Sequence, residues 1–190
     1  MPLTFVFAVA LVLLGTLAFA IAITTYNTVV ALRRRSERAW ANVDVALKQR
    51  HDELPAVVAA VRGQLGFEQQ VLEEVTRLRA AYQPQAPLPE QAATSEATSR
   101  ALRSLFAVVE RYPELRSNQN VTALQQEIER LETLIARRRE LFNEQVYQHN
   151  ATIGQVPAVF IAGIFGWKPL PSFAADPEER VRPVAAFDPR

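Results

Sequence analysis

The pattern of apolar and polar residues changes once along the chain, near residue 25. Before that point, Leu3 to Ile23 reads LTFVFAVALVLLGTLAFAIAI and contains no charged side chain. As a helix, this run would be about 30 Å long, which matches the hydrocarbon thickness of a bilayer. The pattern predicts a membrane-spanning helix within residues 1–25.

A cleaved signal peptide is the alternative interpretation of the apolar run. Ala18-Phe19-Ala20 resembles a small-residue cleavage site. A signal peptide, however, has a basic segment before its apolar part, and here only Met1-Pro2 precedes the run. The run also continues beyond Ala20, so a retained anchor is favoured.

The first charged side chains predict the orientation of the anchor. Arg33, Arg34, Arg35 and Arg38 follow the run, and no charged residue precedes it. Basic residues beside a span stay on the cytoplasmic side. We therefore expect a single-pass membrane protein, with its N-terminus outside and everything after Thr25 in the cytoplasm.

Beyond residue 25, apolar residues recur every three or four positions, which is the spacing of one helix face. The pattern predicts four helices: from Tyr26 to a turn or sharp kink at His51–Leu54, from there to about Tyr82, from about Glu90 to Arg111, and from about Asn120 to Ile153. The turn is expected because Pro55 lacks a backbone donor and disfavours helical geometry before it. No segment of useful length alternates with strand period.

Four amphipathic helices with short connections favour an all-α fold, an up-and-down antiparallel four-helix bundle after the transmembrane helix. The alternative joins the first two helices into one kinked rod and leaves a three-helix arrangement. The expected domains are the anchor at 1–25, the bundle with a C-terminal apolar segment at 26–173, and a proline-containing disordered tail at 174–190.

The composition argues against catalysis. The chain has no cysteine, which excludes thiolate catalysis and cysteine metal sites. His51 and His149 are far apart in sequence, and no nucleophile–base pair, metal cluster or phosphate loop is recognisable. The net charge of +1 provides no field for nucleic acid. We expect no catalytic, cofactor-binding or metal-binding residue, no nucleic-acid partner and no enzymatic activity.

Several polar residues are candidates for structural or interaction roles instead. Asp44 lies one helical turn after Trp40 and one turn before Lys48, which favours a structural ion pair, or else a polar patch at a subunit contact. Arg138 continues the heptad row of Leu124 and Leu131, a spacing typical of a coiled coil.

Two alternatives are open for the polar residues of this last helix. If Arg138 enters the bundle interior, its guanidinium needs a partner, and Glu68 and Asp44 are the candidates; a solvated position is equally consistent with the sequence. Asn143 and Asn150, also a heptad apart, could be buried amides that fix register or surface residues.

The segment from Val156 to Phe173, VPAVFIAGIFGWKPLPSF, is strongly apolar but contains three prolines and two glycines. It therefore cannot span a bilayer as a helix. Either it covers the bundle as a lid, or it touches the membrane or a partner through side chains such as Phe165 and Trp167.

Five blocks in order resemble the LemA family of bacterial membrane-anchored helical proteins. They are YNTVVALRRRSERAWANVDVALKQRHDELP, FEQQVLEEVTRLR, YPELRSNQNVTALQQEIERLE, ARRRELFNEQVYQHN and VPAVFIAGIFGWKP. The positions that match the family pattern are Trp40, Asp44, Lys48, Arg50, Pro55, Glu68, Tyr112, Pro113, Asn118, Leu124, Glu127, Arg138, Asn143, Asn150, Pro157 and Gly166. The chain departs from the pattern at Ala56, Phe67, Phe142 and His149.

The resemblance implies a membrane helix, a cytoplasmic helical bundle and a connection with membrane proteostasis or, in magnetosome-forming bacteria, organelle membrane formation. The leading hypothesis is a non-enzymatic scaffold or self-assembling protein at the inner face of the bacterial inner membrane, with a role in membrane organisation or proteostasis. Its expected partners are the lipid bilayer and further copies of the chain in a homo-oligomer. The alternative is an adaptor or regulatory subunit of a membrane enzyme such as a zinc metalloprotease.

Overall fold

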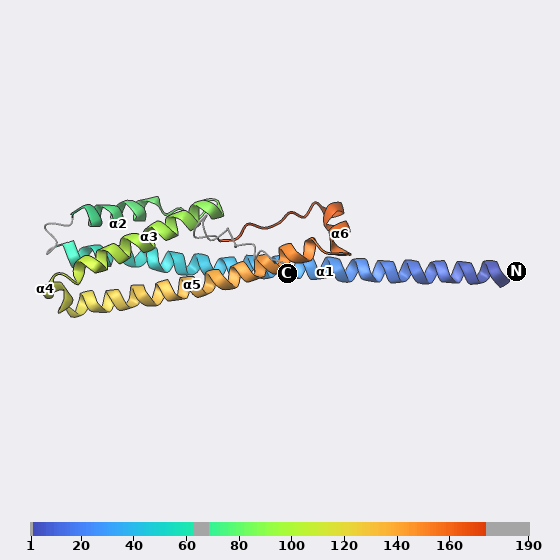
Figure 1. Ribbon diagram of the computed structural model, residues 1–190, viewed down its shortest axis with the longest axis horizontal. Coiled ribbons are helices and arrows are strands. Elements are labelled where there is room, and N and C mark those ends of the chain that lie inside the picture. The colour runs from blue at the N-terminus through green and yellow to red at the C-terminus, as the bar shows by residue number, and fades with distance from the viewer. Residues whose placement is uncertain (1, 63–68, 174–190) are drawn as a thin grey trace, which may run out of the picture. The chain divides into compact units, whose positions relative to one another are not determined.

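The structure is a computed structural model that describes residues 2–62 and 69–173 (Figure 1). The described regular structure is helical throughout and contains no strand, which confirms the all-α fold class. The helices are α1 Pro2–Arg62, α2 Gln69–Ala81, α3 Leu88–Val109, α4 Pro113–Arg116, α5 Gln119–Ile153 and α6 Ala158–Phe165.

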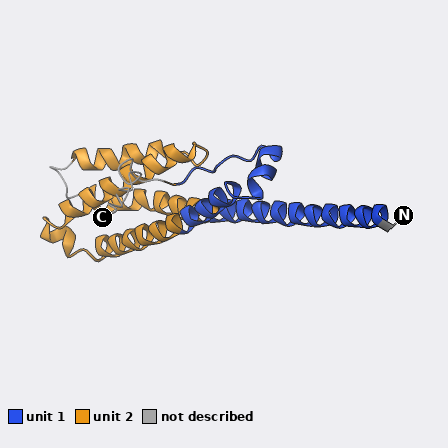
Figure 2. Ribbon diagram, turned by 45° about the vertical axis from the view of Figure 1, so that its right-hand side comes forward, with its two compact units in different colours: residues 1–40, 141–172 blue, residues 41–140, 173–190 orange. Residues whose placement is uncertain are grey.

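The chain forms two compact units, each built from two separate segments (Figure 2). Unit 1 comprises residues 1–40 and 141–172, and unit 2 comprises residues 41–140 and 173–190. These units follow packing, whereas the predicted boundaries at residues 25 and 173 follow composition. The expected disordered tail, 174–190, lies outside the described residues.

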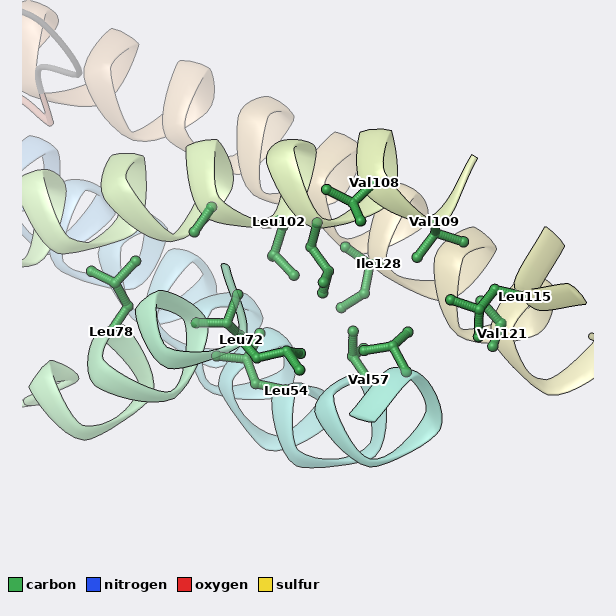
Figure 3. Close-up of a cluster of buried hydrophobic side chains, with 14 residues drawn as sticks. Leu54, Val57, Leu72, Leu78, Leu102, Val108, Val109, Leu115, Val121 and Ile128 are labelled. Carbon is green, nitrogen blue, oxygen red and sulfur yellow. The ribbon is translucent and has the colours of Figure 1, made fainter. Parts of the chain in front are cut away.

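Unit 2 is a helical bundle with an apolar core cluster that Figure 3 shows in close-up. Four long helical segments contribute to this core, as the sequence predicts, and the short helix α4 adds one residue. The core residues are Leu54, Val57 and Val61 of α1, Leu72, Val75 and Leu78 of α2, Ala101, Leu102, Leu105, Val108 and Val109 of α3, Leu115 of α4, and Val121 and Ile128 of α5.

The predicted turn at His51–Leu54 is wrong, because α1 continues through Pro55 to Arg62. A proline inside a helix costs about 3 kcal/mol through the lost hydrogen bond and a clash with the preceding turn. Here Leu54 and Val57, on either side of the proline, are almost completely buried, and each contributes about 1.5–3 kcal/mol of hydrophobic stabilisation. Pro55 itself is exposed.

The second predicted helix is therefore divided differently. Its first part belongs to α1, and its second part is α2, which begins at Gln69. Residues 63–68, which include the predicted interaction residue Glu68, lie outside the described residues.

The two later helices are close to the prediction. The expected helices over 90–111 and 120–153 correspond to α3 Leu88–Val109 and α5 Gln119–Ile153. The sequence analysis missed α4, a single turn that begins at Pro113. Asn118 caps α5, because its Oδ1 accepts hydrogen bonds from the backbone N–H groups of Asn120 at 2.9 Å and Val121 at 3.4 Å.

Unit 1 contains the N-terminal part of α1, the end of α5, and α6. Val29, Ile153, Ala158 and Ala162 form its small core, and Trp167 packs against it. Among the described residues, α1 is the one helix long and apolar enough to cross a membrane. Large apolar side chains along its N-terminal run, such as Leu3, Leu11 and Phe19, are exposed.

Candidate functional site

A buried arginine is the centre of the polar network in unit 2. Arg50 of α1 is only 3% exposed. Its Nη1 donates to Ser99 Oγ at 2.8 Å and to Glu132 Oε1 at 2.6 Å. Its Nη2 donates to the Oγ and the backbone oxygen of Ser95, at 2.9 and 3.2 Å. Ser99 Oγ in turn donates to Glu132 Oε2 at 2.7 Å.

The helical spacing of these residues explains how the network forms. Arg50 lies on the same face of α1 as Leu47 and Leu54, which are buried. Ser95 and Ser99 are one turn apart on α3, and their small side chains leave room for a guanidinium group between the helices. The guanidinium group of Arg50 is thereby paired, as a buried arginine must be, and it links α1, α3 and α5.

A small cavity adjoins the arginine network. Its lining includes His51 of α1, Gln91 of α3 and Tyr82, which follows α2, and its volume is about 20 Å³, enough for one water molecule. His51 and Tyr82 stack with ring centroids 4.5 Å apart. The cavity is thus too small for an organic substrate.

Three residues that line this cavity, and Asp44 outside its lining, have a buried polar atom that is not paired. Asp44 Oδ1, His51 Nδ1, Tyr82 Oη and Gln91 Oε1 are buried without a hydrogen-bond partner among the described residues. Burial lowers the pKa of His51, with Asp52 opposing and Arg79 adding to the effect. Burial and the nearby carboxylate of Asp44 raise the pKa of Tyr82. His51 is therefore favoured as the neutral imidazole and Tyr82 as the neutral phenol.

One pairing expected from the sequence is wrong, and one of the two partners considered for Arg138 is not its partner. No ion pair joins Asp44 and Lys48, because an oxygen of Asp44 is buried while Lys48 stays exposed, where water solvates its ammonium group. Arg138 does not pair with Asp44. It is partly buried, and its Nη1 donates to the backbone oxygen of Asn42 at 2.6 Å.

Sequence reasoning missed the contacts of the neighbouring Arg139. Its guanidinium lies 4.4 Å from the ring centroid of the buried Phe173, and Nη1 lies 3.7 Å from Glu96 Oε2. This cation–π contact joins two residues of unit 2 that are far apart in the sequence. The sequence does not indicate which of the consecutive residues Arg137, Arg138 and Arg139 makes contacts within the bundle.

The remaining candidates in unit 2 have local roles or lie at the surface. Glu127 forms an exposed pair with Arg130 at 2.6 Å, one turn further along α5. The hydrogen bond from Arg130 lowers the pKa of Glu127. Asn118 is the helix cap described above, and Pro55 lies on the exposed side of α1.

In unit 1, Trp40 of α1 contacts Phe142 of α5, with ring centroids 5.5 Å apart. Asn143, also on α5, is partly buried. Asn150 donates through Nδ2 to the backbone oxygen of Leu170 at 2.8 Å and accepts from the Leu170 N–H through Oδ1 at 2.8 Å. Asn150 therefore fixes the segment that follows α6, rather than the register between two helices.

Three aromatic rings gather where the apolar run of α1 ends. Tyr26 of α1 lies 5.0 Å from Phe165 and 5.4 Å from Trp167, measured between ring centroids. Phe165 and Trp167 stack on each other at 5.5 Å. The turn that allows this stacking needs Gly166, which has a left-handed φ of 64° and ends α6.

The described residues contain no group of three or more histidine, cysteine, aspartate or glutamate side chains that could hold a metal ion. The expectation that the chain has no catalytic or cofactor-binding residue stays a prediction. The sites that the structure does describe are a closed polar network in unit 2 and an aromatic cluster in unit 1.

Comparison with known proteins identifies the family. The sequence model of the LemA family matches residues 39–187, which is most of the chain. A search of the curated proteins found no match. The matched region contains the arginine network, the Asn150 contact and the aromatic residues of α6 and its flank. The chain belongs to the LemA family.

Proposed function

We propose that this protein is a non-enzymatic, membrane-anchored helical scaffold that self-assembles at the inner face of the bacterial membrane. The observation that carries the proposal is the composition of α1. One unbroken helix begins with exposed apolar side chains over residues 3–23 and then supplies Leu54, Val57 and Val61 to the core of unit 2. A membrane anchor and a folded bundle thus share one helix.

The polar chemistry of unit 2 supports a structural role over a catalytic one. The guanidinium of Arg50 is satisfied by Ser95, Ser99 and Glu132. The adjoining cavity holds about one water molecule. A catalytic site needs a reactive group that can reach a substrate. In this network, by contrast, the charged groups of Arg50 and Glu132 are paired with each other between helices.

The anchor is tested by fractionation. Leu11→Asp combined with Leu14→Asp places two carboxylates in the apolar run, and each costs about 2.5–3.5 kcal/mol at the centre of a membrane helix. This variant should move to the soluble fraction. A matched control, Val45→Asp combined with Leu141→Asp, changes two exposed residues elsewhere and should stay in the membrane. If both variants stay in the membrane, residues 3–23 are not the anchor.

The scaffold role is tested by purification from native membranes at low detergent, with particle mass and co-purifying proteins measured together. A large homo-oligomer of defined mass is the expected result. A monomer bound to one membrane protein, such as a zinc metalloprotease, would instead favour an adaptor. Turnover of a substrate that is lost in a folded Arg50→Lys variant would overturn the non-enzymatic assignment.

A further inference from the structure

Helix α6 is apolar on all sides, and its small residues are the ones that pack inward. The helix reads AVFIAGIF and has no polar side chain. Ala158 and Ala162 are buried at 3% and 6% exposure, against Val29 and Ile153. Phe160 and Ile164, in contrast, are 68% and 79% exposed. A lid over a core would bury its largest side chains, because they gain most from leaving water.

The exposed face of α6 adjoins the end of the apolar run of α1 within the same unit. Phe165 and Trp167 pack on Tyr26, which is only three residues beyond Ile23. In a helix, three residues correspond to about 4.5 Å along the axis. If residues 3–23 span the bilayer, α6 therefore lies at the level where the hydrocarbon meets the headgroups. Aromatic rings are enriched at that level.

The charges around α6 suit the same level. From Ala151 to Ser172 the chain contains no acidic residue, and its single cation is Lys168, which is exposed and follows Trp167. On α1, Arg33 to Arg35 lie about 10 Å beyond Tyr26 along the helix axis. This combination of an apolar face and flanking cations fits the interface of a membrane that contains anionic lipids.

We propose that α6 is a second, non-spanning membrane contact, with Phe160, Ile164 and Phe165 inserted at the lipid interface. The inference rests on the proposed anchor. The exposed face of α6 contacts the bilayer rather than a second copy of the chain, because this face continues the exposed apolar surface of α1 through Tyr26. Such a contact would prevent unit 1 from rotating about the axis of its membrane helix. A membrane helix without a second contact can turn freely about that axis.

The absence of cysteine from the chain allows a direct test on the full-length protein. Single-cysteine variants Phe160→Cys and Ile164→Cys carry a polarity-sensitive fluorophore. Leu141→Cys and Tyr147→Cys are matched controls, because these residues of α5 in unit 1 are also 58% and 67% exposed. Each labelled protein is placed in phosphatidylcholine–phosphatidylglycerol nanodiscs with one chain per disc. Quenching by spin-labelled lipid is compared with quenching by aqueous iodide.

The expected result is at least a threefold excess of lipid quenching over iodide quenching at 160 and 164, and the reverse at 141 and 147. Equal access of iodide to all four positions would overturn the proposal. So would protection at 160 and 164 that occurs only when several chains share a disc, because a second copy would then cover α6. A label at Leu11→Cys reports on the anchor itself. If lipid quenches the label at 11 while the labels at 160 and 164 stay in water, this inference fails and the proposed anchor stands. If the label at 11 also stays in water, the proposed function fails as well.

Discussion

At the scale of single residues, Arg50 is a buried side chain that joins three helices of unit 2. Its charge is buried, and its hydrogen bonds reach two other helices. An ion pair removed from water is weak evidence for stability, because desolvation offsets much of the attraction. Removing Arg50 would have a larger effect, because it would leave the carboxylate of Glu132 without its ion pair and Ser95 Oγ without the hydrogen bond from Nη2.

Arg50→Ala should lower the free energy of unfolding by about 3 kcal/mol, the lower end for breaking a buried pair, because Glu132 is partly exposed. The measurement is chemical unfolding of the full chain in detergent, followed by circular dichroism. As a control, Arg130→Ala removes the exposed pair with Glu127 and should leave the unfolding midpoint where it is. Equal midpoints for both variants would show that the Arg50 network contributes nothing to stability.

His51 should make the bundle sensitive to mild acid. Because burial lowers its pKa below 6.5, the unfolded chain takes up a proton at a higher pH than the folded chain does. The free energy of unfolding should therefore fall as the pH drops below about 6.5, until the folded-state pKa is passed. Above this window His51 contributes no pH dependence.

The test compares thermal unfolding of the natural chain with that of His51→Gln at pH 7.5 and 5.5. The glutamine variant should lose less stability between the two pH values, because it lacks the titrating imidazole. An identical loss in both proteins would assign the acid sensitivity to other groups.

At the scale of the elements, α1 shows how packing overrides a local signal. Pro55 predicted a helix end, yet the residues around it face a continuous core and the helix continues to Arg62. Pro55 therefore destabilises α1 but does not end it.

Pro55→Ala should accordingly raise the free energy of unfolding, by about 1–3 kcal/mol, because alanine restores the backbone donor and removes the clash with the preceding turn. Ala59→Pro, on the exposed side of α1 one turn later, is the matched control and should lower it by about 3 kcal/mol. A loss of stability in Pro55→Ala would mean that the proline is needed for the path of α1.

The contact between α1 and α5 in unit 1 predicts that two alanine variants will lose different amounts of stability. Phe142 is 5% exposed, so Phe142→Ala should cost about 3–5 kcal/mol. Trp40 packs on the same ring but is only partly buried, so Trp40→Ala should cost less than that range. Thermal unfolding of the two variants gives the order, and a larger loss for Trp40→Ala would show that its ring carries contacts beyond Phe142.

At the scale of the whole molecule, the arginines after the apolar run predict a cytoplasmic C-terminus. A reporter that is active only in the cytoplasm should work when fused after Arg190, and an export-dependent reporter at the same position should be silent. The opposite result would reverse the orientation. Moving Arg33, Arg34 and Arg35 to the N-terminal side of residue 3 should invert the activity of both reporters if these charges set the topology.

The sequence by itself determined the helical class, the apolar run and the limits of α3 and α5. These features depend on local spacing and composition: a run of apolar residues, or a stripe every three or four positions, carries its own signal. The blocks that carry the family pattern are equally local, because each block consists of neighbouring residues.

Only the tertiary structure decided which polar residues meet. Arg50 stands out in the sequence only as a position of the family pattern, and nothing local connects it with Ser95, Ser99 or Glu132, which come from other helices. Arg138 and Arg139 were likewise ambiguous, because adjacent residues of a helix point about 100° apart and the direction of the core is set by packing. The inward alanines of α6 were undetectable in a segment that is apolar on all sides, since hydrophobic periodicity requires polar residues to contrast with.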